Sequence, residues 1–281
     1  MSSCFDNRPR ASDWLVRTLS VERWYNDSAP KWKYLPSVVQ AQAERIRRSR
    51  LLKKYGSAKL GSLLARCKAN ARCLSGCCPE CGRALQRFFV SRANTLLDPH
   101  TDYAAVSIVT RTYRRTGKLA SLPLEGLVAR LHRACNKGRI LIAIGGVDFS
   151  FNEHLSKGHD GRWVPQFWLL VHVGNRARWE RAFRRIYQPR QNVPRPVKIL
   201  IWDGNIDALG YSLKTNFVRR ISTRTERFAR GKFRSCKNTR ADRLRAAERV
   251  ELFQYLHSLG LEARLVLFGV IRSRYGFEVE P

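Results

Sequence analysis

The sequence predicts an α+β protein: a ferredoxin-like (split βαβ) antiparallel sheet core with one added helix, preceded by a helical, cysteine-rich segment. Between residues 103 and 219, short β-branched runs and stretches of helical periodicity follow one another in the order β-α-β-β-α-β-α. Upstream of them, four cysteines fall within residues 67–81. Hydrophobic residues make up 44% of the 281-residue chain, which suffices for a sizeable core.

Each core element follows from its own pattern. Residues 103–112 are short and β-branched, which favours a strand. In residues 123–136, Leu124, Leu127 and Leu131 share one face, which predicts a helix. The later patterns predict, in order, a hairpin of strands at 139–152 and 163–173, a basic helix at 177–187, a strand at 196–203 and a helix at 206–219.

The flanking segments are more basic and less regular. Residues 222–240 lack apolar periodicity, so we expect a mobile loop there. The other flanking predictions are an irregular stretch at 1–35, helices at 37–55, 83–97 and 241–259, and a last strand at 264–272. These changes divide the chain into a basic helical region with the cysteines (1–98), a sheet core (99–220) and a C-terminal region (221–281).

The charge points to a polyanionic partner. Lys and Arg number 53 against 22 Asp and Glu, a formal net charge of +31, which favours nucleic acid first and an anionic membrane surface second. No apolar run reaches the ~18 residues of a membrane span, and residues 1–11 lack the apolar core of a secretion signal, so we expect a cytoplasmic protein without a membrane partner. The predicted phosphate contacts are Arg47, Arg48, Lys53, Arg181, Arg184, Arg185, Arg219 and Arg220; a solvated helix face is the alternative for the first three.

The cysteines predict a structural metal site. Cys67, Cys73, Cys78 and Cys81 are closely spaced, and a Cys-Pro-x-Cys turn can present two thiolates to one tetrahedral ion. Close packing of thiols favours a closed structural zinc site over a catalytic one. Cys77 competes with Cys73 as a ligand, spacing does not separate zinc from iron, and a cluster of reduced thiols without metal is the alternative.

Tyr211 and Lys214 form the first candidate for chemistry. At 100° per residue Tyr211 lies away from the apolar stripe of the predicted helix 206–219, and Lys214 projects near that stripe. A tyrosine beside a cation suits attack on a phosphodiester, because an ammonium favours the phenolate and stabilises charge on the phosphate. The pattern is short, and a boundary tyrosine packed over the stem of Lys214 is the alternative.

The predicted hairpin carries the second candidate. Side chains two residues apart on a strand share a face, so Gln166 and Trp168 point one way with Leu170 and His172. Asp148, Ser150 and Asn152 likewise share a face of the partner strand. Polar residues that persist on one face of a hairpin indicate a site, unless that face is simply solvated.

Together these residues resemble the HUH endonuclease superfamily, in particular the rolling-circle replication initiators (Rep proteins) of plasmids, phages and other mobile elements. The resemblance covers residues 103–219: the order of elements, a hairpin motif of the type W-x-P-H-x-H-L-L-V, and Y-x-x-K on a following helix. It implies Tyr211 as the nucleophile that nicks single-stranded DNA and stays attached to the 5′ phosphate, with Lys214 as its helper. Many members also have a cysteine-rich segment upstream.

The same resemblance implies a divalent cation. In the family two histidines around a hydrophobic residue hold Mg²⁺ or Mn²⁺, and here Gln166 and Trp168 occupy those positions. A glutamine carbonyl is a weak ligand for a hard cation and tryptophan is none, so Gln166 and Asp148 become the candidate ligands of a degenerate site.

Three functions follow as alternatives. The first is an initiator-like enzyme that nicks single-stranded or origin DNA through Tyr211. The second is a zinc-containing nucleic-acid-binding protein of a mobile element that has lost this chemistry. The third is a basic structural protein that binds RNA or DNA. The charge and the cysteines suit all three, whereas the hairpin and Y-x-x-K favour the first two.

Overall fold

The computed structural model describes residues 11–26, 33–68, 70–97, 102–154, 159–190, 193–205, 207–229, 232–273 and 276–280. Its α-helices are α1 (Asp13–Leu19), α2 (Val38–Tyr55), α3 (Ala58–Ala65), α4 (Pro79–Leu96), α5 (Leu124–Gly138), α6 (Arg176–Ile186), α7 (Asp207–Ser212) and α8 (Ala246–Leu259). Its strands are β1 (Tyr103–Val109), β2 (Arg114–Arg115), β3 (Ala143–His154), β4 (His159–His172), β5 (Val197–Ile201), β6 (Val218–Ala229), β7 (Lys232–Arg243), β8 (Leu265–Phe268), β9 (Val270–Arg272) and β10 (Phe277–Val279).

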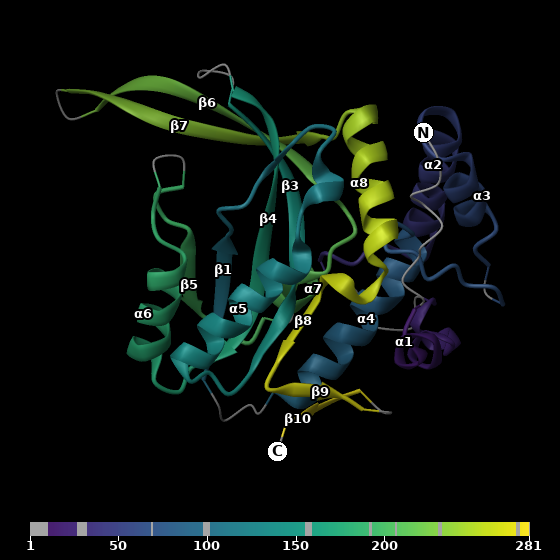
Figure 1. Cartoon of the computed structure of the whole chain (residues 1–281), viewed down its shortest axis with the longest axis horizontal. Helices are drawn as coiled ribbons and strands as arrows, with labels where there is room; N and C mark the ends of the chain where they lie inside the picture. Colours follow the sequence, from purple (N-terminus) through teal and green to yellow (C-terminus); the bar gives the residue numbers. More distant parts are fainter. Residues whose placement is uncertain are drawn as a thin grey trace.

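A mixed sheet lies at the centre of the fold (Figure 1). Its main path runs β5-β1-β4-β3-β6-β7, with β2 paired to β4 and β8 paired to β3. The neighbours within β5-β1-β4-β3 are all antiparallel, whereas β6 runs parallel to β3. The predicted α+β class is confirmed at this level.

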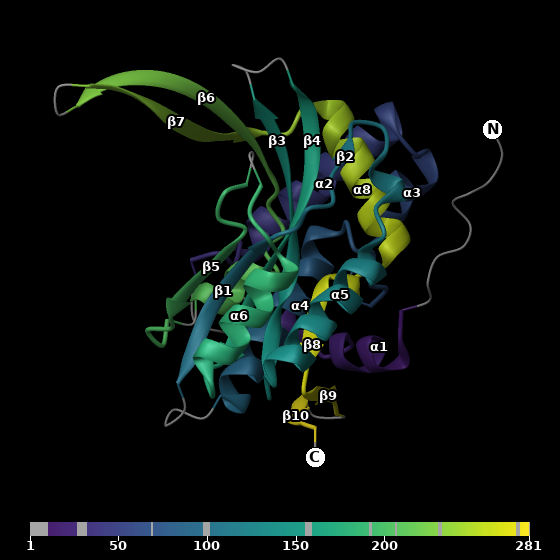
Figure 2. The same ribbon diagram turned by 60° about the vertical axis from the view of Figure 1, so that its left-hand side comes forward.

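The two faces of the sheet have different surroundings. One face is covered by α5, α6 and α8; there Phe149 packs against Tyr255, and Trp163 Nε1 donates to Glu251 at 2.9 Å (Figures 1 and 2). We call the other face the open face, because only its lower part is covered, by α4 and α7. Residues paired across neighbouring strands share a face, so Gln166 lies there with its partners Val109 and Asp148.

One hydrophobic core joins the three sequence regions. Leu52 and Phe88 from the N-terminal region, Ile108 and Phe167 from the sheet, and Phe253 from α8 belong to the same buried cluster. Four buried cysteines, Cys67, Cys77, Cys78 and Cys81, are part of it. The cysteine-rich segment is therefore packed on the sheet domain. Among the described residues, no helix is both long and apolar enough to cross a bilayer.

The expected mobile loop at 222–240 is wrong. Strands β6 and β7 pair antiparallel along their whole length, from Val218↔Arg243 to Ala229↔Lys232. Only Arg219–Ser222 pair with β3, so the rest of the hairpin leaves the body of the sheet as a two-stranded ribbon (Figure 1). The apolar alternation that identifies a strand arises from one buried face, and a ribbon that extends beyond the core has none.

Several boundaries also differ from the predictions. The helix predicted at 206–219 ends at Ser212, and the chain then turns inward at Lys214 before β6 begins; residue 206 lies outside the described residues. The irregular stretch at 1–35 contains α1, and α3 was not predicted. The last strand is split into β8 and β9 at Gly269, where φ is +65° and a Cβ would lie 1.7 Å from the Leu141 carbonyl oxygen.

Candidate functional site

Four cysteine sulfurs gather where α3 ends and α4 begins. The Sγ atoms of Cys67, Cys73, Cys78 and Cys81 all lie within 4.8 Å of one another. Three of the separations are 3.8 Å for Cys67–Cys81, 3.8 Å for Cys67–Cys78 and 3.9 Å for Cys73–Cys81. A tetrahedral ion with metal–sulfur bonds of about 2.3 Å requires sulfurs ~3.8 Å apart. The cluster therefore has the spacing of a four-thiolate metal site.

Local structure explains why these cysteines meet. Cys78 is the N-cap of α4 and Cys81 lies in its first turn, with Pro79 at the start of the helix, so two sulfurs face the same point beside the helix N-terminus. Hydrogen bonds to neighbouring sulfurs, above all to Cys67, together with burial, raise the pKa of Cys78 and of Cys81 well above the ordinary value. A divalent cation bound by these sulfurs would stabilise their thiolate forms and so displace the protons.

Cys77 is excluded from the cluster, which answers the question left open by the spacing. Its Sγ lies 3.2 Å from Ser75 Oγ, and burial raises its pKa to about 12. Its carbonyl oxygen accepts a hydrogen bond of 3.0 Å from Arg48 Nη1. Cys77 is thus a buried packing residue beside the four clustered cysteines.

An ion-pair network supports the cysteine segment. Glu80, in the first turn of α4, accepts from Arg45 Nε at 2.5 Å and from Arg72 Nη1 at 2.7 Å. The Arg72 guanidinium also lies 3.7 Å from the ring centre of Tyr25. Because these side chains are largely buried, the network fixes α2, the cysteine loop and α4 relative to one another.

Helix α4 connects this cluster to the open face of the sheet. Gln86 Nε2 donates to the carbonyl oxygens of Gly210 at 2.6 Å and of Tyr34 at 3.0 Å. Arg48 Nη2 donates to the Thr215 carbonyl oxygen at 2.8 Å, next to Lys214. The segments that carry both candidate catalytic residues are therefore held by the cysteine-rich segment.

Tyr211 lies in an aromatic cluster on the open face. Its ring meets Trp168 edge to face at 4.6 Å between centres, and Tyr34 in the same way at 4.9 Å. Burial, and then the negative charge of Asp148, raise the pKa of Tyr211, although Arg220 opposes this shift. The expectation that its surroundings favour a phenolate is therefore wrong, because desolvation outweighs the nearby cation.

Lys214 forms an ion pair with Asp148, and its Nζ also lies 4.9 Å from the ring centre of Tyr211. The Asp148 carboxylate is fully buried at the centre of β3, and Lys214 Nζ contacts its Oδ2. Gln166, opposite Asp148 in the sheet, donates to Ser150 Oγ at 3.1 Å. The structure thus brings Asp148, Gln166 and Lys214 together, but the ammonium occupies the carboxylate that was expected to hold a divalent cation. Among the described residues, the four cysteines are the only cluster of His, Cys, Asp or Glu with metal-binding spacing.

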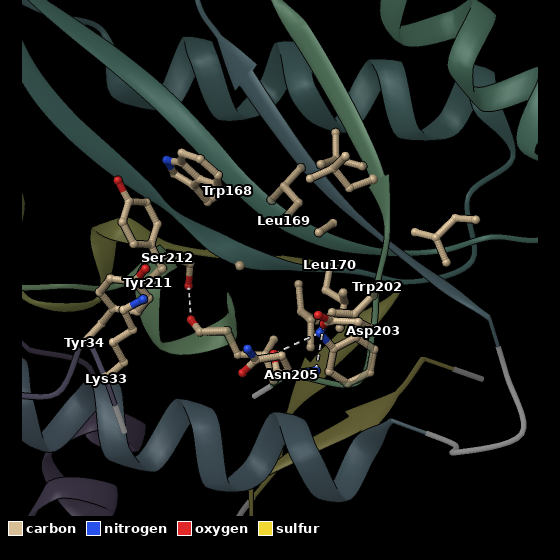
Figure 3. Close-up of a pocket in the computed structure, with 17 residues that line it drawn as sticks. Lys33, Tyr34, Trp168, Leu169, Leu170, Trp202, Asp203, Asn205, Tyr211 and Ser212 are labelled. Carbon is tan, nitrogen blue, oxygen red and sulfur yellow. Dashed lines mark hydrogen bonds between the residues drawn. The ribbon is translucent and has the colours of Figure 1, made fainter. Parts of the chain in front are cut away.

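An aromatic cavity of about 510 Å³ opens beside Tyr211 on the open face (Figure 3). Tyr34, Trp168 and Tyr211 line one end, and Trp202, Asp203 and Asn205 line the other. The remaining wall is mainly aliphatic. We call it the aromatic cavity.

A second cavity of about 550 Å³ lies further along the same face, towards the β6–β7 ribbon. Gln166, two residues before Trp168, contributes to its lining, and no carboxylate lines it among the residues that the structure describes. We call it the arginine cavity after its five arginines, Arg111, Arg162, Arg190, Arg195 and Arg220. The Nε atoms of Arg111 and Arg162 are buried without a hydrogen-bond partner, which leaves donors available to an anion.

The predicted phosphate contacts are distributed unevenly. Arg48 and Arg219 are buried and bound to protein groups, Arg219 by Glu153 and Glu248, so neither is available to a phosphate. Arg181, Arg184 and Arg185 are exposed, but on α6, which covers the opposite face of the sheet. Arg220 lines the arginine cavity. Arg47 and Lys53 are exposed on α2.

Sequence reasoning missed Arg111, Arg162 and Tyr34. Arg111 lies in a loop and Arg162 on β4, and strand pairing brings both to the open face. Tyr34 lies before α2 and is held at this face by the hydrogen bond from Gln86. No local pattern marks them.

No protein family, curated protein or solved structure matches the chain in the comparisons with known proteins.

Cys73→Ser tests the ligand set against Cys77→Ser. We expect the purified wild type to bind one divalent metal ion per chain, Cys73→Ser to lose it, and Cys77→Ser to retain it, because only Cys73 is among the four clustered sulfurs. Elemental analysis of the purified proteins measures the metal content. Equal metal content in the two variants would contradict this ligand set.

Lys214→Met tests the buried ion pair. Removing the ammonium leaves the buried Asp148 carboxylate without its counter-charge, so we expect the free energy of unfolding to fall by about 3–5 kcal/mol. Adding Asp148→Asn to Lys214→Met should recover much of this loss, since the uncompensated charge disappears. Urea denaturation measures both. A loss below about 1 kcal/mol for Lys214→Met would show that the pair is not buried in solution.

Proposed function

We propose that the protein binds single-stranded nucleic acid, most favourably DNA, across the open face of its sheet. The observation that carries this proposal is the placement of a carboxylate-free arginine cavity next to an aromatic cavity on one face. Arginine donors contact phosphates of any sequence, and aromatic rings stack on bases. The two cavities together offer both kinds of contact that a single strand requires.

The fold of the core supports the same proposal. The strand order β5-β1-β4-β3, with antiparallel neighbours and α5 and α6 on one face, is the order expected of a split βαβ core, and we propose that the core is ferredoxin-like. The resemblance to replication initiators rests on this order and on the place of Tyr211 after the fourth core strand. A replication or regulatory factor of a mobile element is the cellular role that fits it.

We propose zinc as the ion of the cysteine cluster, in a structural role. Four thiolates with tetrahedral spacing suit zinc, and the burial of three of the four sulfurs leaves no open position for a substrate. When bound, the ion would fix the start of α4. It would thereby support Gln86, which holds the backbone at Tyr34 and Gly210.

DNA nicking by Tyr211 is the second candidate function. It is favoured by the contact of Tyr211 with Trp168, which occupies a position of the family's metal-binding histidines in the hairpin motif. In this reaction the tyrosine oxygen would attack the phosphorus, form a phosphotyrosine bond to the 5′ phosphate and release a 3′ hydroxyl. Two observations weigh against it: Lys214 neutralises Asp148, and the pKa of Tyr211 is raised. The residues present do not fit a Mg²⁺ or Mn²⁺ site, so binding is the first proposal.

Arg195→Gln and Arg111→Gln test the binding face. We expect affinity for a dT oligonucleotide to fall steeply with salt, with a log–log slope of about −3.5 for five arginine contacts on a single strand. Each substitution should reduce the slope by about 0.7, because one phosphate contact is lost. Fluorescence anisotropy over a range of salt concentrations measures the slope.

Arg133→Gln is the matched control, since Arg133 is exposed on α5, a helix that covers the opposite face of the sheet. Its slope should equal that of the wild type. A slope near zero for the wild type, or equal effects of all three substitutions, would refute binding at the arginine cavity.

A nicking assay distinguishes the second candidate. Labelled single-stranded DNA is incubated with the protein and Mn²⁺, and a covalent adduct is sought on a denaturing gel. Since Asp148 is paired with Lys214 and the surroundings of Tyr211 favour its neutral form, we expect the wild type to bind DNA without forming an adduct. An adduct that disappears in Tyr211→Phe would establish the nuclease and overturn this expectation.

A further inference from the structure

We propose that the aromatic cavity is a subsite for one guanine base of the bound strand, with Asp203 as the group that recognises it. This inference rests on the proposed function and adds a base preference to it. It is carried by the single carboxylate among the described residues of the cavity and by the aromatic walls.

Asp203 is an exception on this face. Among the described residues that line the two cavities, it is the only carboxylate, in a chain with a net charge of +31. A carboxylate repels phosphates, so its presence here is unfavourable unless it meets hydrogen-bond donors. A base edge is the part of a nucleic acid that supplies such donors.

The carboxylate is held in a fixed place. Asp203 Oδ1 accepts from the backbone N–H of Asn205 at 3.0 Å, and Trp202 Nε1 donates to the Asn205 carbonyl oxygen at 3.0 Å. This closed turn lies at the end of the cavity opposite Tyr211 and Tyr34 (Figure 3). A preorganised acceptor loses little entropy when it binds a donor pair.

Only one common base matches this acceptor. Guanine presents two adjacent donors, N1–H and the N2 amino group, which a carboxylate can accept together. On the same edge adenine and cytosine each place an acceptor beside their amino group, and thymine places its N–H between two carbonyls. A bidentate contact of this kind discriminates between bases by roughly ten- to a hundredfold, and the aromatic rings of the cavity can stack on the base.

The neighbouring cavity fits the same strand. Trp168 lines the aromatic cavity, and Gln166, two residues earlier on β4, lines the arginine cavity. The cavities therefore adjoin on one strand of the sheet. A strand that places one base in the aromatic cavity can therefore place a neighbouring phosphate at the arginine cavity.

The test compares dT12 with the same strand carrying one dG, one dA or one inosine in the middle. Inosine keeps N1–H and lacks the amino group. Affinities are measured by anisotropy at one salt concentration for the wild type, Asp203→Asn and Asp102→Asn. Asparagine preserves the turn at 203, and Asp102 is an exposed carboxylate outside both cavities, so both variants remove one negative charge.

For the wild type we expect about tenfold tighter binding of the dG strand than of dT12, and little gain for dA or inosine. Asp203→Asn should bring the dG-to-dT12 ratio to about one, while Asp102→Asn keeps it. A ratio near one in the wild type, or a preference that persists in Asp203→Asn, would overturn the guanine subsite and leave strand binding intact. Absence of salt-dependent binding to dT12 would overturn the proposed function as well.

Discussion

The fully buried carboxylate of Asp148 is the constraint around which the candidate site is arranged. A charge at the centre of a sheet is unfavourable without compensation, and here Lys214 supplies it. Arg264 is also buried nearby, donates to the carbonyl oxygens of Val147 and Lys214, and has its pKa lowered to about 10 by burial. To reach Asp148 the chain leaves its helix at Ser212 and turns inward. Tyr211 is thereby placed against Trp168.

The cysteine-rich segment and the open face form one structural unit. The cysteine cluster surrounds the start of α4, and Gln86 of the same helix holds the backbone of the two tyrosine-bearing segments. Arg48 links the Cys77 carbonyl to the turn beside Lys214. A disturbance of the cysteine cluster would therefore reach the aromatic cavity, although among the described residues no sulfur lines it.

Arginine serves two opposite purposes in this protein. Arg48, Arg219 and Arg264 are buried and satisfy carbonyls or carboxylates, so they contribute to the fold and not to a phosphate-binding surface. The arginines around the second cavity are partly exposed, and two of them keep buried donors without partners. The net charge alone therefore overstates the surface available to a polyanion.

The core elements could be predicted from the sequence, because apolar periodicity records which face of each helix and strand is buried. The cysteine cluster could be predicted too, because its four cysteines are close along the chain. The remaining features became visible only in the tertiary structure. The β6–β7 ribbon has no buried face to leave a periodic pattern along its length, and the choice of Cys73 over Cys77 depends on where the sulfurs point. The local sequence around Arg48 is equally compatible with a solvent-exposed helix face and with the core, so it does not reveal that Arg48 is buried. The Asp148–Lys214 pair and both cavities arise from residues distant in the chain, and packing alone brings them together.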